Sequence, residues 1–230
     1  MKLIALLFPV AIAAAAGAQQ GFPFTNESLK YTIEYSSGLS LGGAAFNATH
    51  SAAGWSFDAT INAAVPGFNV SDILRASATD QLCSIELTRD LSNGRKKTRE
   101  KTTFDEKTGK AHRVTTMPED GGETTFTIPS CARDALTYLY YARRELGQGR
   151  VPHAQDIYFG SSYTAKMDYA GAQNITIKGK STVTDHLVIS VKGPKSDFSF
   201  EVFFARDAAR TPLEIRVPAA AGVLTAIIEQ

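Results

Sequence analysis

Apolar residues stand at every second position along most of this chain, which is typical of strands with one buried face. Tyr31, Ile33 and Tyr35 form one such series, and another begins at Trp55. Turn-forming residues separate the series, as in the segment Ser92-Asn93-Gly94. The pattern predicts about a dozen antiparallel strands. They are expected at residues 31–35, 44–49, 55–62, 83–88, 95–105, 111–116, 124–128, 156–158, 163–169, 174–179, 186–192, 197–205, 213–217 and 223–228.

A different periodicity predicts one main helix at about residues 131–146. Ser130 is the expected N-cap, Gly147 the expected stop, and Arg143 is expected to point outward. We therefore expect a mainly β protein, an antiparallel strongly curved sheet or open β-barrel, with the helix at its mouth or inner face. Apolar residues of the helix recur at spacings of three and four and share one face: Ala135, Leu136, Leu139, Tyr140 and Leu146.

The first 18 residues have the character of a signal peptide. Lys2 precedes an apolar run that ends in small residues at Ala18. The run is shorter than the about 20 apolar residues that a membrane-spanning helix needs. The alternative is a buried helix of the core. We expect residues 19–230 to form a single β-rich domain that is periplasmic or secreted, and soluble after cleavage.

The mature chain contains two cysteines, Cys83 and Cys131. In an exported protein an even pair is first interpreted as a disulfide. Such a bond would close a loop of roughly 50 residues and stabilise the fold by about 4 kcal/mol in the chain-entropy model. Two buried thiols are the alternative.

The charge and the scattered histidines exclude several kinds of function. The formal net charge is +1 with Lys2 included, so no field of the whole protein attracts nucleic acid. We expect no nucleic-acid partner, no metal, no cofactor and no catalytic residues. The histidines show no metal-ligand spacing, and each is expected to be solvated or singly hydrogen-bonded: His50, His112, His153 and His186.

One stretch of the chain is strongly basic. On a strand, Arg95, Lys97, Arg99 and Lys101 would share one face. That face is a candidate patch for an anionic group or a partner protein. The alternative is a solvated edge whose charges prevent aggregation.

Five segments resemble a bacterial exported family catalogued as domain of unknown function 3108 (DUF3108). They are residues 31–35, 38–42, 95–105, 131–143 and 210–215. The resemblance covers nearly all of the mature chain and implies a periplasmic β-rich protein. It favours a strand at residues 68–79, where Ser71 could otherwise cap a short helix. By a looser analogy of fold, it implies similarity to carriers of outer-membrane lipoproteins.

These observations lead to one functional hypothesis and one alternative. We expect a non-enzymatic periplasmic envelope protein that binds a hydrophobic ligand, such as a lipid or another apolar small molecule, or a lipidated partner. The alternative is an assembly module that docks an envelope protein or polysaccharide through a sheet edge or the basic strand. The aromatic residues expected to bind the ligand are Trp55, Phe57, Tyr140, Phe198 and Phe200.

Overall fold

The computed structural model describes residues 22–35, 37–65, 67–194, 196–219 and 222–229, so the predicted signal peptide lies outside the described residues. They form a 15-stranded sheet in the order β8-β7-β6-β5-β4-β3-β2-β1-β15-β14-β13-β12-β11-β10-β9. The strands are β1 (Asn26–Tyr35), β2 (Ser40–Ser51), β3 (Gly54–Val65), β4 (Phe68–Ala78), β5 (Ser84–Asn93), β6 (Lys96–Asp105), β7 (Lys110–Met117), β8 (Gly122–Thr127), β9 (Arg133–Asp134), β10 (Gln155–Tyr158), β11 (Ser162–Ile177), β12 (Lys180–Lys192), β13 (Asp197–Ala205), β14 (Pro212–Ala219) and β15 (Gly222–Ile228).

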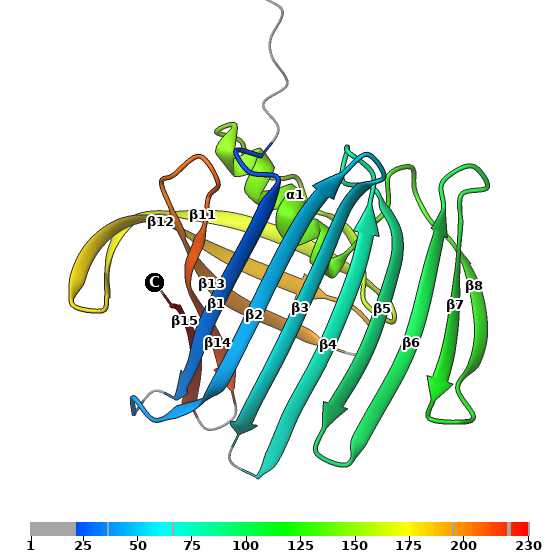
Figure 1. Ribbon diagram of the computed structural model, residues 1–230, viewed down its shortest axis with the longest axis horizontal. Coiled ribbons are helices and arrows are strands. Elements are labelled where there is room, and N and C mark those ends of the chain that lie inside the picture. Colours follow the sequence, from blue (N-terminus) through cyan, green and yellow to red (C-terminus); the bar gives the residue numbers. More distant parts are fainter. Residues whose placement is uncertain (1–21, 36, 66, 195, 220–221, 230) are drawn as a thin grey trace, which may run out of the picture.

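Two antiparallel meanders, β1–β8 and β10–β15, are joined by the pairing of β1 with β15, and the short strand β9 adds to β10 in parallel. The sheet curls strongly, so that β11–β13 lie behind β1–β5 (Figure 1). The curl brings the residues around β9 back to the start of β5, where the Ser84 N–H donates to the Ala132 carbonyl at 2.9 Å. β6–β8 extend beyond this contact (Figure 1). The prediction of a strongly curved sheet or open barrel is confirmed.

The helix α1 (Ala135–Gly147) lies between the two walls of the curl. One apolar cluster joins Leu136 and Tyr140 to β2–β7, and a second joins Ala142 and Leu146 to β10–β13. The two faces of the helix therefore bury the inner surfaces of both meanders. No helix among the described residues is long and apolar enough to cross a membrane.

The predicted start of the helix was wrong by four residues. Cys131 has a φ of 54°, which is outside the right-handed helical region. Arg133 and Asp134 then pair with β10 as β9. The N-cap is consequently Asp134 and not Ser130, and Gly147 is the last helical residue with Gln148 as the C-cap.

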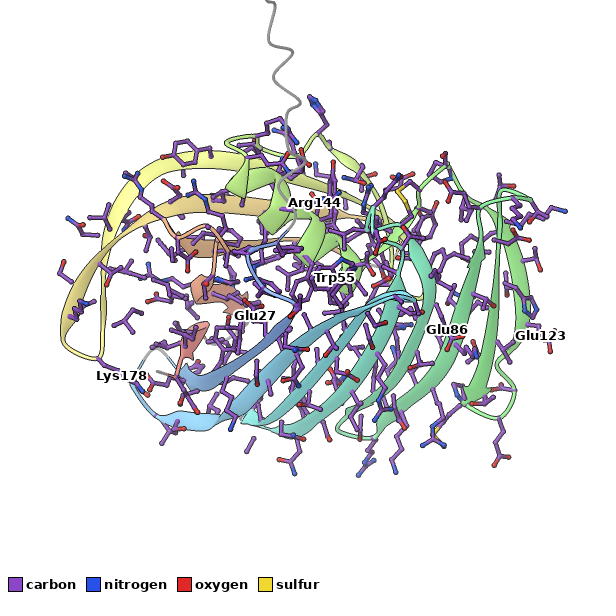
Figure 2. The ribbon with its side chains drawn as sticks, turned by 45° about the horizontal axis from the view of Figure 1, so that its top comes forward. Glu27, Trp55, Glu86, Glu123, Arg144 and Lys178 are labelled. Atoms are coloured by element: carbon purple, nitrogen blue, oxygen red, sulfur yellow. A yellow bond between two sulfur atoms is a disulfide. The ribbon has the colours of Figure 1, made fainter. Side chains whose placement is uncertain are left out.

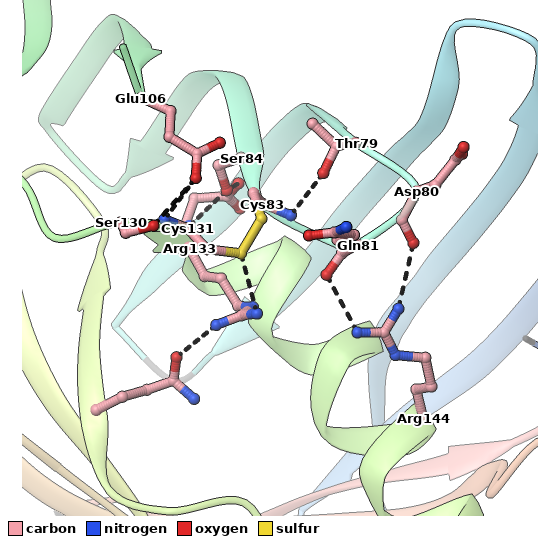
Figure 3. The surroundings of a disulfide bond; sticks show 12 residues. Thr79, Asp80, Gln81, Cys83, Ser84, Glu106, Ser130, Cys131, Arg133 and Arg144 are labelled. Atoms are coloured by element: carbon pink, nitrogen blue, oxygen red, sulfur yellow. Dashed lines mark hydrogen bonds between the residues drawn. A yellow bond between two sulfur atoms is a disulfide. The ribbon is translucent and has the colours of Figure 1, made fainter. Parts of the chain in front are cut away.

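Two further predictions concern local structure near β4 and β5. The disulfide between Cys83 and Cys131 is confirmed, with the two Cα atoms 4.5 Å apart (Figure 3). Strand β4 covers residues 68–78, so the strand predicted at residues 68–79 is confirmed. Strand β6 begins at Lys96, because Gly94 and Arg95 form the hairpin turn and Gly94 has a φ of 61°.

Candidate functional site

The end of the interior next to α1, at the top of Figure 1, is filled by the helix and by aromatic side chains. The Tyr140 ring stacks on Phe57 with centroids 4.2 Å apart, and Trp55 stacks on Phe57 at 5.8 Å. Phe57 and Tyr140 are both 0% exposed. Figure 2 shows Trp55 beside the helix. We call this region, built from Trp55, Phe57 and Tyr140 with Leu187 and Phe204 on the opposite wall, the filled half.

A buried ion pair anchors the C-terminal part of α1 in the filled half. Arg143 donates to both carboxylate oxygens of Glu27, at 2.6 and 2.7 Å, and its Nε donates to the carbonyl of Ala209 at 3.1 Å. The Arg143 side chain is 1% exposed, so the prediction that it points outward was wrong. A guanidinium with this many acceptors offsets the cost of its burial. Burial also raises the pKa of Tyr31 and of Tyr140.

Asp134 fixes the start of the helix to β5. Its carboxylate accepts the N–H groups of Leu136 and Thr137, both at 2.9 Å, and the hydroxyls of Thr137 at 2.6 Å and Ser84 at 2.5 Å. Burial raises the pKa of Asp134, whereas these hydrogen bonds oppose that shift. The disulfide lies beside this network, and Arg144 reaches the carbonyls of Asp80 and Gln81 (Figure 3).

The end of the interior away from α1 is different, because its apolar side chains are partly exposed. Val202 and Ile215 are register partners on the inner face of β13 and β14, where buried Val202 belongs to the cluster that includes helix residues. On the same face of β13, Phe200 stands two residues from Val202, and Phe198 stands two residues beyond Phe200. On the same face of β14, Val217 stands two residues from Ile215. Val217 is 37% exposed and Phe198 is 44% exposed.

The opposite wall continues this apolar surface. Tyr35 pairs with Leu224, which in turn pairs with Val217. On β3, Ile61 stands four residues beyond Phe57 on the same face. All these side chains are inward-facing and half-buried or exposed. We call this surface the trough, and define it by Tyr35, Ile61, Phe198, Phe200, Val217 and Leu224.

A polar cavity of about 400 Å³ lies between β5, β6 and the turn that joins β10 to β11. Arg89 and Glu100 form an ion pair in its wall, and their side chains are 8% and 11% exposed. The Arg89 guanidinium lies 4.2 Å from the centroid of the Phe159 ring. Lys96 and Tyr163 complete much of the rim. We call this space the Arg89 cavity.

The model of the protein family of unknown function DUF3108 matches residues 30–229. The chain belongs to this family. As a DUF3108 protein it shares its fold with a solved β-barrel-like protein of the domain of unknown function DUF1849 from Brucella abortus. The two chains are 7% identical, with a TM-score of 0.65 over 91% of this chain and 98% of the other. At this identity the likeness concerns the fold alone. No curated protein matches.

The five predicted ligand-binding aromatics of this DUF3108 protein fall into two groups. Trp55, Phe57 and Tyr140 are core residues of the filled half, in direct contact with one another. Phe198 and Phe200 belong to the trough, with ring centroids 6.1 Å apart. The structure therefore does not bring the five together, because α1 covers the first group only.

The predicted basic patch lies on the convex face of β6. Arg99 donates twice to Asp90, at 2.8 and 3.0 Å, and Lys101 lies 2.8 Å from Glu86. Acidic neighbours on β5 thus oppose much of the positive charge. Arg95 is not on this strand face, contrary to the prediction, because it stands in the turn before Lys96.

Sequence reasoning missed the charged residues of the Arg89 cavity. A signal for them exists, because Arg89 stands between Leu87 and Leu91 in an alternating series where an apolar residue is expected. Its partner Glu100 comes from the next strand through the register of β5 and β6. In the described part of the chain, no three His, Cys, Asp or Glu side chains are placed to hold a metal ion.

Proposed function

We propose that this DUF3108 protein is a non-enzymatic protein of the bacterial cell envelope that binds a hydrophobic ligand in the trough. The ligand is a molecule with an acyl chain. The observation that carries the proposal is the exposure of inward-facing Phe198 and Val217, at 44% and 37%, whereas Val202 on the same face of β13 is buried. Large apolar side chains that line a concave surface and stay in contact with water favour a ligand that displaces this water.

The shape of the sheet supports the same proposal. The sheet curls strongly, and α1 lies against only one end of its inner face (Figure 1). The remaining walls carry mostly apolar side chains and half-exposed aromatics, which is the usual lining of sites for apolar molecules. Export to the periplasm, which the N-terminal segment predicts, would place the protein where lipids cross between membranes.

The direct test is binding of oleate to the mature protein, measured by displacement of a fluorescent apolar probe. Val217→Ser is expected to weaken binding about fivefold, because burial of a valine side chain against a chain contributes roughly 1 kcal/mol. Val183→Ser is the matched control, since Val183 is 50% exposed but lies on the β11–β12 hairpin outside the trough. Equal affinities for the two variants would contradict the proposal.

Native mass spectrometry of protein purified gently from the periplasm provides a second readout. We expect an apolar molecule to accompany the folded protein and to be lost on denaturation. Phe198→Ser should reduce the fraction of loaded protein. If the wild type carries nothing and binds no oleate, binding in the trough is wrong.

A second function is favoured by the edge strand β8. This strand ends the sheet, and five of its six residues are exposed. An unpaired edge can bind an extended segment of another protein as an additional strand. We expect Thr125→Lys, which adds a charge to this edge, to reduce recovery of an envelope partner in a pull-down. Unchanged recovery would exclude docking at β8.

A further inference from the structure

The Arg89 cavity opens from the same inner surface as the trough. Leu91 lines the cavity. On β5 it occupies the row of inward residues that contains Asp72 on β4 and Ile61 on β3. Ile61 is a trough residue. An elongated molecule in the trough can therefore place one end in the Arg89 cavity without leaving the inner face of the sheet.

Cationic groups exceed carboxylates around this cavity. Arg89 and Lys96 line it together with Glu100. Arg113 lies next to the lining, since its Nη1 donates to the carbonyl of the lining residue Gly160. Asp72 stands nearby on β4 and accepts from the Ser92 N–H at 3.2 Å, and burial raises its pKa. In and beside the lining of the cavity, three cations thus accompany two carboxylates.

Part of this positive charge is not saturated within the described chain. The Nε of Arg113 is buried and has no hydrogen-bond partner there. A buried donor without an acceptor costs free energy, and an acceptor from a ligand removes that cost. The Glu100 carboxylate is meanwhile occupied by Arg89 and by the Thr115 hydroxyl at 3.3 Å. An unpaired donor beside the cavity and an occupied carboxylate within it both favour the entry of an anion.

The turn after β10 closes over the ion pair and shapes the cavity. Gly160 has a φ of 72°, and a Cβ there would overlap the guanidinium of Arg89. A residue other than glycine would therefore displace either the turn or Arg89. The fit of this turn over a charged pair shows that the polar end of the inner surface is a built feature and not a loose surface depression.

We propose that the Arg89 cavity holds the anionic head group of the ligand whose apolar chain lies in the trough. The inference rests on the proposed function and adds the ligand class, a single-chain amphiphile with a carboxylate or phosphate at one end. Guanidinium and ammonium donors bind such groups through charge-assisted hydrogen bonds, which are stronger than neutral ones. Leu91, Phe159 and Tyr163 supply the apolar surroundings in which the chain leaves the head group.

The test compares oleate with oleyl alcohol, which has the same chain without the charge. We expect wild-type protein to bind oleate about tenfold more tightly, the difference expected for one charge-assisted hydrogen bond. The double variant Lys96→Gln/Arg113→Gln should bind the two molecules equally. Higher salt should weaken the binding of oleate to wild-type protein and leave that of oleyl alcohol unchanged.

Lys97→Gln is the matched control, because Lys97 is the next residue of β6 and faces the convex side. It should leave the preference for oleate intact. If the double variant fails to fold, Lys96→Gln alone is the test, since Lys96 is exposed at the rim; it should lower the preference about threefold.

The remaining outcomes separate this inference from the proposed function. Equal binding of oleate and oleyl alcohol by wild-type protein would overturn the head-group site and leave the trough in place. Binding of neither molecule would overturn both. Inorganic phosphate that binds the cavity as tightly as oleate, and is unaffected by Val217→Ser, would show a site for free anions and overturn the assignment to an amphiphile.

Discussion

The filled half and the trough share strands β3 and β13, yet only the filled half is closed to water. On β3, Phe57 is completely buried, whereas Ile61 lies four residues further on the same face and is half-buried. On β13, Val202 is buried and Phe198 is 44% exposed. The composition of the two surfaces is similar. The difference is α1, which covers one end of the curl and stops before the other.

The position of α1 is itself fixed at both ends by polar contacts. Asp134 and the Cys83–Cys131 disulfide tie its start to β5, and the Arg143–Glu27 ion pair ties its other end to β1. These contacts hold the helix at one depth in the curl. The trough therefore follows from where the helix is anchored.

The largest effect is expected from removing an aromatic ring in the filled half. Phe57→Ala should lower the free energy of unfolding by about 3–5 kcal/mol, because it leaves a cavity beneath Tyr140. Phe198→Ala should cost less than about 1 kcal/mol, since nearly half of that side chain is in water already. Urea unfolding of both variants measures the contrast.

The comparison would fail if the two substitutions had the same cost. A loss of several kcal/mol on Phe198→Ala would mean that the trough is packed in solution. It would then belong to the core, and no ligand could enter it. Oleate affinity provides a second measurement on the same variant. Phe198→Ala should weaken oleate binding although it hardly changes stability.

The alternation in the sequence predicted most strands but not which inward residues remain exposed. Both walls of the filled half and of the trough carry the same period of two, since the pattern reports only that a face is turned inward. Whether a helix covers that face depends on contacts between residues far apart, such as Arg143 with Glu27. No local pattern contains this information.

The helix boundary was missed for a related reason. Residues 131–134 have helical spacing, but Cys131 stands in a turn with a positive φ, and pairing with β10 holds Arg133 and Asp134 extended. The cysteine pair itself was predictable from export and from the even count. The backbone conformation around Cys131 could not be predicted in the same way, because it depends on where Cys83 lies in the folded chain.

The second prediction removes the disulfide that anchors the start of α1. Cys83→Ser/Cys131→Ser should lower the free energy of unfolding by about 3–4 kcal/mol, because the unfolded chain gains the freedom of the loop between the two residues. Reduction of the wild type should produce a similar loss, and the reductant should not change the variant. A stability loss below about 1 kcal/mol would show that the remaining contacts of α1 suffice.

The third prediction tests the N-cap at the same place. Asp134→Ala should cost about 2–3 kcal/mol, because two helix N–H groups and the buried Ser84 and Thr137 hydroxyls lose their acceptor. Asp156→Ala is the control, since the hydrogen bond that Asp156 accepts from Thr164 is exposed. It should change stability by less than about 0.5 kcal/mol.

Asp134→Ala should also alter the trough if the helix anchor sets its depth. A looser α1 would make the inner face more accessible, so the fluorescence of a bound apolar probe should rise in this variant. Unchanged probe binding, together with the expected loss of stability, would separate the anchor from the trough.

The smallest effect is expected on the convex face, where neither half of the interior is involved. Lys97→Glu/Arg99→Glu/Lys101→Glu should lower stability by about 1 kcal/mol, because exposed ion pairs contribute little and the new charges face Asp90 and Glu86. Oleate affinity should be unchanged, since these side chains point away from the trough. Lys166→Glu, on β11, is the control for a change in net charge. Loss of a protein partner in the triple variant alone would mean that the basic face of β6 docks this partner, and the interior would then be only one of two binding surfaces.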